Sequence, residues 1–485
     1  MATAFNRIED QKRYVRQLRE SITAHPYLCL SFGLYWMQTV LLFQSPYSFL
    51  DPSPLAGISA FPKGTLLLIA SVATYLIWAF GFRGANRFSE ARWFPFVLCG
   101  TLVAGALLYT SYPLLTARHP DLAIVLYLTG SLLIGCGTAN ICLETGRMFG
   151  YLGPLHVLFI GSSSLLLGTL GAFALAALPP LVAQVVLVLV PLPMVACLWK
   201  CLRHTPRRAL YGQGMQTPVN IPVKFLITSF FQGLALGVMH SVLITNSDNS
   251  ALVVSLGYGA AVALLFFCAI AVKNNFDVLI YRIGFPLMAL GFFAVGMLDF
   301  AMLPGALTLD AGYCFQYLMT CSLCAYLAKG LRQPPIWIIG TGTAALLIGQ
   351  FAGSLLDVLI DEWRFLATTV AFTLLLAALF MTSSQNIRRG WGAISPGATP
   401  EVNRETRSLD TACQLLATEQ GLTPRETEVF ELIIRGYSRK AIAEELSLAE
   451  ETVKTHTGRI YQKFLVHSRQ ELIHAAEQRA EALEQ

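Results

Sequence analysis

The sequence predicts an all-α fold in two parts: a polytopic membrane bundle of about twelve spans, followed by a soluble domain of four short helices. The 485-residue chain is 55% hydrophobic and only 13% charged, whereas soluble domains average about 25% charged residues. Apolar stretches of about 20 residues, the length that crosses a hydrocarbon core, recur between residues 26 and 383. The alternative, a soluble protein with a large buried core, would need many more charged faces.

The membrane part is expected to begin after a basic N-terminal segment, residues 1–25. This segment carries five cations between Arg7 and Arg19, and the apolar run that follows is too long for a cleavable signal peptide. The expected spans are 26–45, 65–82, 94–115, 121–143, 154–176, 179–199, 223–245, 251–272, 277–301, 310–329, 335–359 and 364–383.

Loop charges predict the orientation of this bundle. If the N-terminus lies inside, nearly every inside loop is basic, whereas the outside loops carry only Lys63, Arg118 and Arg364. Positive residues favour the cytoplasmic side of a membrane, and an even number of spans returns the C-terminus to that side. We therefore expect a multi-pass protein of the inner (cytoplasmic) membrane with both termini in the cytoplasm.

The longest basic loop, 200–222, divides the bundle into six plus six spans. This layout resembles the major facilitator architecture, in which two six-helix halves face each other across a central site. Such transporters usually carry a Gly-x-x-x-Asp-Arg-type motif after the second span. Here the loop reads GFRGANRFSEARW, with Asn86 and Arg87 near the positions of the acid and the arginine. The resemblance therefore implies the fold more strongly than active transport.

Polar side chains within the spans are the candidate ligand-binding residues. The alternative for each residue is a purely structural role, either in a hydrogen bond between helices or at the membrane interface, because buried polar groups are costly in a bilayer. In a facilitator-like layout the first and fourth spans of each half line the centre, and a small aromatic or amphipathic ligand would suit the residues there. The candidates on those spans are Tyr35, Gln38, Asn140, Gln232, His240 and Gln316.

The acidic residues of the bundle argue against a proton-coupled carrier, which would need a buried acid in the middle of a span. Glu144, Asp299 and Asp357 all lie near the ends of their expected spans. No spacing of His and Cys is typical of a metal site, and the Cys321-x-x-Cys324 pair within a span is better read as packing. We therefore expect neither a metal nor a cofactor.

Glycines predict close helix packing in two spans. Three lie on the fifth span and three on the eleventh, where small residues let helix backbones approach each other. They are Gly161, Gly168, Gly171, Gly342, Gly349 and Gly353.

After the last span the composition changes to Ser, Gly, Pro and Asn, which predicts a flexible linker over 384–417 and a separate domain over 418–485. Thr423-Pro-Arg-Glu426 is a capping box that opens the first helix of this domain. A second helix follows Ser438, a third spans Glu450 to Phe464, and a second capping box at Ser468 opens a fourth. A short helix, a tight turn and a longer helix form the helix-turn-helix layout.

A helical wheel divides the third helix into two faces. Val453, Thr457, Ile460 and Phe464 share the face that must pack on the first two helices. The opposite arc carries side chains that can enter a major groove of DNA: Glu451, Lys454, Thr455, Gly458, Arg459 and Gln462.

Three motifs of this domain resemble the LuxR/GerE helix-turn-helix family: LTPRE, G-x-S-x-K-x-IA-x-x-L and TVK-x-H…I-x-x-K. The resemblance covers about residues 418–480. It implies that Lys454 and Thr455 contact bases, and that Lys440, Thr452 and Lys463 contact phosphates of double-stranded DNA. It also implies a homodimer through the fourth helix, whose apolar stripe is Leu472, Ala476, Ala480 and Leu483.

This sequence departs from the family at the start of the third helix, where Ala449 replaces the usual Ser cap. From residue 384 onward the tail carries 13 Lys and Arg against 15 Asp and Glu. Non-specific affinity for DNA should therefore be modest. The alternative to a DNA-binding tail is a helical module that binds another protein.

The whole chain resembles membrane-bound LuxR-type regulators of some anaerobic actinobacteria, some of which respond to small aromatic compounds. The resemblance implies a membrane-integrated one-component transcription regulator with a small-molecule inducer, for which it suggests an aromatic compound. The second hypothesis is a major-facilitator-like transporter with an autoregulatory DNA-binding tail. A third, an enzyme, is not expected, because the sequence has no nucleophile–base pair, phosphate loop or kinase signature.

Overall fold

The structure is a computed structural model of the chain. It describes residues 19–43, 64–115, 118–176, 178–205, 210, 223–246, 256–265, 276, 278–298, 302–330, 334–360, 362–382, 412–413, 415–434, 439, 442–443, 446, 448–466 and 468–482. The chain divides into two compact units, Met1–Pro396 and Gly397–Gln485, each with its own hydrophobic core.

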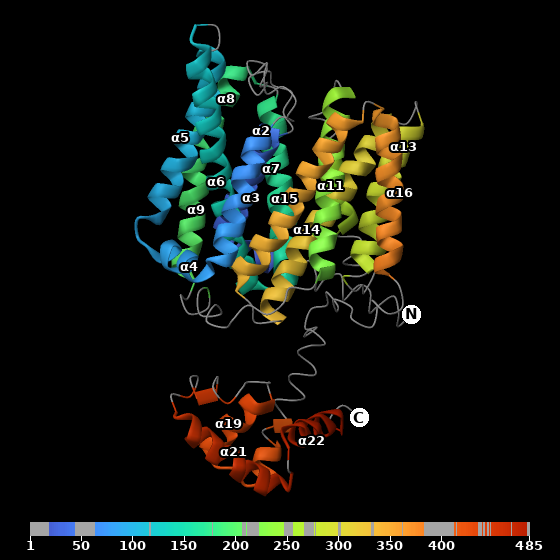
Figure 1. Ribbon diagram of the computed structural model, residues 1–485. Helices are drawn as coiled ribbons and strands as arrows, with labels where there is room; N and C mark the ends of the chain where they lie inside the picture. Colours follow the sequence, from blue (N-terminus) through green and yellow to red (C-terminus); the bar gives the residue numbers. More distant parts are fainter. Residues whose placement is uncertain are drawn as a thin grey trace. The chain divides into compact units, whose positions relative to one another are not determined.

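The helices of the first half of the membrane unit run from residue 26 to residue 204. They are α2 (Pro26–Phe43), α3 (Thr65–Phe80), α4 (Phe82–Glu90), α5 (Phe94–Leu115), α6 (Pro120–Leu152), α7 (Pro154–Ala176), α8 (Pro180–Leu189) and α9 (Pro191–His204). Within this half α2 packs on α7, and α6 packs on both α3 and α5 (Figure 1).

The second half runs from residue 223 to residue 381. Its elements are α11 (Val223–Asn246), a helical segment Leu256–Leu265, the π-helix η3 (Val278–Gly284), α13 (Phe285–Met297), α14 (Met302–Gly330), α15 (Pro335–Leu359) and α16 (Trp363–Met381). Here α11 packs on α15, and α13 packs on α14 and α16 (Figure 1). The halves meet where α15 contacts α3 and where α14 contacts α6 and α7.

The predicted membrane bundle is confirmed, and every expected span contains a described helix. Seven described helices are long and apolar enough to cross a membrane, and three shorter apolar helices begin at Thr65, Val223 and Leu256. With α2 and α14, the apolar helical segments among the described residues number twelve.

Close packing through glycine is confirmed, and it is tightest between α11 and α15. A Cβ atom at Gly349 would lie 2.0 Å from the carbonyl oxygen of Phe230, and one at Gly353 would lie 2.3 Å from that of Leu234. The facing glycine, Gly233, is equally crowded, because its Cβ would lie 1.7 Å from the carbonyl oxygen of Leu346. The two backbones are therefore in direct contact, a geometry that only glycine permits.

Two helices extend beyond the expected spans, and each extension changes the surroundings expected for an acidic residue. The fourth span continues as α6 to Leu152, so Glu144 lies within the helix and is buried. The tenth span begins at Met302, so Asp310, expected at its outer end, lies inside α14 with no exposed surface. Helix packing shields both acids, and hydropathy alone does not detect such shielding.

The C-terminal unit contains α19 (Pro424–Ile434), α21 (Glu450–Phe464) and α22 (Arg469–Ala482). Residues 439, 442 and 443 are helical, at the place of the expected second helix. The domain core also includes Cys413 and Leu416, which lie in the expected linker. Folded structure therefore starts earlier than residue 418, because these side chains are buried in the same core as Val429 and Phe430 of α19.

Candidate functional site

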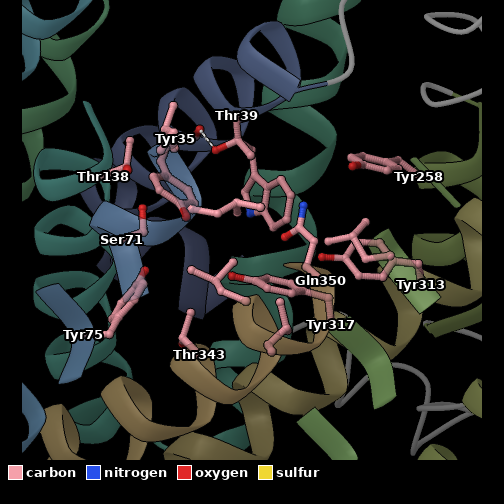
Figure 2. A pocket seen from close by; sticks show the side chains of 16 residues that line it. Tyr35, Thr39, Ser71, Tyr75, Thr138, Tyr258, Tyr313, Tyr317, Thr343 and Gln350 are labelled. Atoms are coloured by element: carbon pink, nitrogen blue, oxygen red, sulfur yellow. Dashed lines mark hydrogen bonds between the residues drawn. The ribbon is translucent and has the colours of Figure 1, made fainter. Parts of the chain in front are cut away.

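The membrane unit encloses a cavity between its two halves. The first half contributes side chains from α2, α3 and α6, and the second half contributes side chains from α11, the segment 256–265, α14 and α15. Figure 2 shows the residues that line it. The cavity volume is about 100 Å³. An apolar cavity of roughly 150 Å³ holds one benzene molecule, so the smaller space here sets a single ring as the upper limit for a ligand.

Aromatic rings dominate the cavity wall. Trp36 bridges the halves, because its ring centroid lies 4.8 Å from that of Tyr317 on α14 and 6.1 Å from that of Tyr258, edge-on to both. The indole Nε1 of Trp36 is buried without a hydrogen-bond partner among the described residues. The wall therefore offers one unused donor beside a set of phenol rings: Tyr35, Tyr75, Tyr258, Tyr313 and Tyr317 (Figure 2).

Of the five candidate ligand residues whose side chains the structure describes, Tyr35 alone lines this cavity. Gln38 and Gln316 are fully buried outside the lining, and neither amide has a hydrogen-bond partner among the described residues. Gln232 accepts a hydrogen bond from Thr320 at 2.9 Å, and Asn140 donates to the carbonyl of Cys136 on its own helix at 2.8 Å. His240 lies on α11, but its side chain is outside the described residues.

Sequence analysis missed most of the wall because tyrosines within a membrane helix look like ordinary packing residues. One signal was present in the spacing of Tyr313 and Tyr317, which places two phenols on one face of α14. Gln350 of α15 also lines the cavity. Its amide is the kind of polar side chain that the sequence analysis expected at the ligand site.

A second, smaller cavity adjoins the first and shares Tyr317, Thr343 and Leu346 with it. Its wall includes Cys142 on α6 together with Cys321 and Cys324 on α14. The space between the halves therefore follows α14 over several turns.

A buried ion pair within α6 is hydrogen-bonded to α4. Arg147 contacts Glu144 with 3.1 Å between Nε and Oε2, and the two side chains are 1% and 3% exposed. Ser89 donates to Glu144 Oε1 at 2.6 Å, and Arg147 Nη1 donates to Asn86 Oδ1 at 2.7 Å. Asn86, the residue near the position of the transporter acid, thus binds arginine as a neutral acceptor.

The third helix of the C-terminal unit, α21, has the two faces expected for it. Val453 and Ile460 are fully buried, and Phe464 stacks on Phe430 with 4.9 Å between ring centroids. The opposite arc is exposed at all six expected positions: Glu451, Lys454, Thr455, Gly458, Arg459 and Gln462. Thr452 is also exposed, and Lys440 lies outside the described residues.

Two lysines of the candidate DNA surface have acidic partners. Lys454 lies 3.2 Å from Glu451, and this pair is so exposed that replacing it by a DNA contact costs little. Lys463 differs, because its Nζ lies 2.8 Å from Glu426 Oε2 and 2.8 Å from the carbonyl of Gly421. A phosphate at Lys463 would compete with a carboxylate that is only 3% exposed.

Glu426 connects the first and third helices of the domain. It completes the expected capping box, because Thr423 N–H donates to Glu426 Oε2 at 2.9 Å and Glu426 N–H donates to Thr423 Oγ1 at 3.3 Å. The hydrogen bond from Lys463 and the one from the Thr423 N–H lower the pKa of Glu426 to about 2. At α21 itself, Ala449 has extended backbone and provides no side-chain cap.

We expect the stability of the isolated domain, residues 397–485, to fall at acid pH because of Glu426. A carboxyl whose pKa is lowered by folding stabilises the fold fully above its unfolded pKa, here about 4.5, and loses that contribution as the pH falls toward 2. Chemical denaturation between pH 6 and pH 2.5 measures this. Glu426→Gln should remove much of the pH dependence, whereas Glu428→Gln, at a half-exposed neighbour, should preserve it. Equal slopes for both variants would contradict the assignment.

The fold and the two sites define a class of protein: a multi-pass membrane domain of the major facilitator fold joined to a helix-turn-helix domain. Residues 420–476 match the family described as "Bacterial regulatory proteins, luxR family". The C-terminal unit is therefore a LuxR-type helix-turn-helix domain.

Curated relatives match this domain alone. The HTH-type transcriptional regulator MalT of Vibrio cholerae serotype O1 (strain ATCC 39315 / El Tor Inaba N16961) is 46% identical over 57 residues. MalT of Serratia proteamaculans (strain 568) is 49% identical over 57 residues. In both cases the match covers 12% of this chain and 6% of the relative.

Solved structures match the membrane unit. The human organic anion transporter MFSD10 (TETRAN) aligns with a TM-score of 0.56 at 16% identity, over 75% of this chain and 99% of the transporter. The proton:xylose symporter XylE of the major facilitator superfamily aligns with a TM-score of 0.54 at 13% identity, over 76% of this chain and 96% of the symporter. At these identities the likeness establishes the fold alone.

Proposed function

We propose that this protein is a membrane-integrated one-component transcription regulator, which binds a small molecule between the halves of its membrane domain and operator DNA through α21. The observation that carries the proposal is the covalent continuity of the two parts. A LuxR-type domain, residues 420–476, follows in one chain a facilitator-fold domain with an enclosed, tyrosine-rich cavity. A bound ligand can shift such a bundle only if its two states bind that ligand with different affinity.

The cavity supports an aromatic inducer. Its walls come from both halves, so a ligand in contact with Trp36 and Tyr317 touches two bodies that can move relative to each other. Phenol and indole rings stack on aromatic ligands, and the unused Nε1 of Trp36 can donate to an oxygen on the ligand.

We propose further that two tails form a homodimer on DNA in the cytoplasm, with a seam that cannot include the first two residues of the expected stripe. The side chains of Ala480 and Leu483 lie outside the described residues. Leu472 and Ala476 are fully buried in the core of their own domain, because α22 closes that core. The exposed side of α22, including Gln470, His474 and Gln478, remains for a partner. A linker that brings two tails together raises their effective concentration.

Binding of DNA by α21 gives the direct test. We expect Lys454→Ala to weaken binding of the isolated domain to a duplex selected by the wild type from a random pool. Loss of one base contact costs about 1–3 kcal/mol, or roughly 5- to 150-fold in affinity, and relaxes the preference at one position. Fluorescence anisotropy with the selected duplex and single-base variants measures both effects.

Gln420→Ala, which changes an exposed residue outside both α21 and α22, is the matched control and should bind as the wild type does. If Lys454→Ala retains full affinity and sequence preference, α21 does not read the groove through this arc.

Transport is the second candidate, and Asp310 favours it. The argument against a proton-coupled carrier was that all acids lie near span ends, yet Asp310 is fully buried within α14. Accumulation of a labelled ligand by sealed vesicles would support the transporter with an autoregulatory tail. Specific binding without accumulation would support the sensor.

A further inference from the structure

Asp310 is the most unusual buried group of the membrane unit. It has no exposed surface, and neither of its carboxyl oxygens has a hydrogen-bond partner among the described residues. A buried carboxylate without a partner costs several kcal/mol, so such a group is neutral or meets a cation that comes from outside the fold.

The fold makes room for this carboxyl. A Cβ atom on Gly257 would lie 2.5 Å from Asp310 Oδ2, so a side chain at residue 257 would collide with it. The next residue, Tyr258, lines the main cavity. The carboxyl of Asp310 therefore lies against the same short helix that supplies part of the cavity wall.

Helix periodicity places Asp310 in line with the cavity. At 100° per residue, Asp310, Tyr313 and Tyr317 fall within an arc of about 60° on α14, and both tyrosines line the cavity. The rise from Asp310 to Tyr313 is about 4.5 Å. Asp310 thus lies about one turn beyond the cavity-lining stripe, outside the lining itself, at the end nearer the start of α14.

An unpaired carboxyl next to a set of phenol rings is the chemistry that recognises an organic cation. The ring faces of tyrosine attract a positive charge, and a carboxylate in a low-dielectric site binds one strongly. We propose that Asp310 anchors the cationic nitrogen of a small aromatic amine whose ring occupies the tyrosine cavity. This inference rests on the proposed sensor function and adds to it that the ligand carries a positive charge.

The amine satisfies what the protein alone leaves unsatisfied. Its N–H groups donate to the oxygens of Asp310, and an oxygen substituent on its ring can accept from Trp36 Nε1, which also lacks a partner among the described residues. The space of about 100 Å³ sets a single ring as the upper limit for the part of the ligand inside the cavity.

The test compares three probes of one shape and different charge on the purified full-length protein in nanodiscs at pH 7: 2-phenylethylamine, 2-phenylethanol and phenylacetate. Isothermal titration and the ligand-induced rise in unfolding temperature measure binding. We expect the amine to bind at least tenfold more tightly than the alcohol, and phenylacetate to bind most weakly.

Variants separate the charge from the ring. Asp310→Asn should remove the tenfold advantage of the amine and leave the alcohol unchanged, whereas Tyr313→Leu should weaken both. Asp121→Asn, at an exposed acid in the first turn of α6, is the control and should behave as the wild type does. If Asp310→Asn does not fold, the comparison of the three probes on the wild type still decides.

Two results would overturn the inference: equal binding of amine and alcohol by the wild type, or full amine affinity in Asp310→Asn. Asp310 would then be a neutral structural carboxyl. Tight binding of the alcohol with an intact transcriptional response would overturn the inferred positive charge of the ligand but not the proposed sensor function. Full operator affinity and unchanged sequence preference in Lys454→Ala would instead count against the proposed DNA reading by α21 and leave the charge of the ligand untouched.

Discussion

Alanine at position 233 is expected to disrupt the second half of the membrane domain. Its Cβ would lie 1.7 Å from the carbonyl oxygen of Leu346 and 2.9 Å from the backbone nitrogen of Gln350. Both atoms belong to the backbone of α15, which cannot move aside as a flexible side chain can. Overpacking costs about 1–3 kcal/mol, and contact with helix backbone places this substitution at the upper end of that range.

The unfolding temperature of the purified full-length protein measures the effect. Gly100→Ala is the matched control, because a Cβ at Gly100 on α5 has no described atom within 4 Å and alanine favours helix. We expect Gly100→Ala to unfold at or above the wild-type temperature and Gly233→Ala well below it. Identical unfolding of the two variants would mean that α11 and α15 are not in backbone contact.

Removal of Glu144 is expected to have an effect of similar or larger size. Glu144→Ala leaves Arg147, whose side chain is 1% exposed, without its acidic partner. Loss of one member of a buried ion pair costs about 3–5 kcal/mol because an uncompensated charge stays buried. We expect a large fall in the yield of folded protein and in its unfolding temperature.

Replacing the whole pair should be less harmful than breaking it. The double variant Glu144→Leu with Arg147→Met removes both charges and should recover a large part of the lost stability, with a residual deficit from Ser89 and Asn86, which lose their partners. Glu428→Ala provides a comparison at the same i,i+3 spacing, since the Arg425–Glu428 pair is 42% and 50% exposed. That change should cost the C-terminal domain at most about 1 kcal/mol. A double variant as unstable as Glu144→Ala would show that the hydrogen bonds, rather than the charges, hold this cluster.

The sequence by itself determined the parts of this protein that depend on local periodicity. Apolar length located a helix in each expected span, because a bilayer requires about 20 apolar residues in sequence. Small residues at positions 349 and 353 predicted a close helix contact without naming the partner helix. The wheel of α21 separated the buried Val453 and Ile460 from the exposed arc, because one helix face must cover the domain core.

Only the tertiary structure decided what lies opposite each of these faces. Periodicity marked Leu472 and Ala476 as apolar but could not tell a dimer seam from the core of the same domain, in which both are buried. Lys463 was basic and near the expected DNA surface, and its pairing with Glu426, 37 residues away, appears only in the folded domain. The tyrosine cavity and the buried Asp310 were also decided by the tertiary structure alone. A cavity forms where helices distant in sequence fail to fill the space between them. The residue pattern of one helix carries no information about that space.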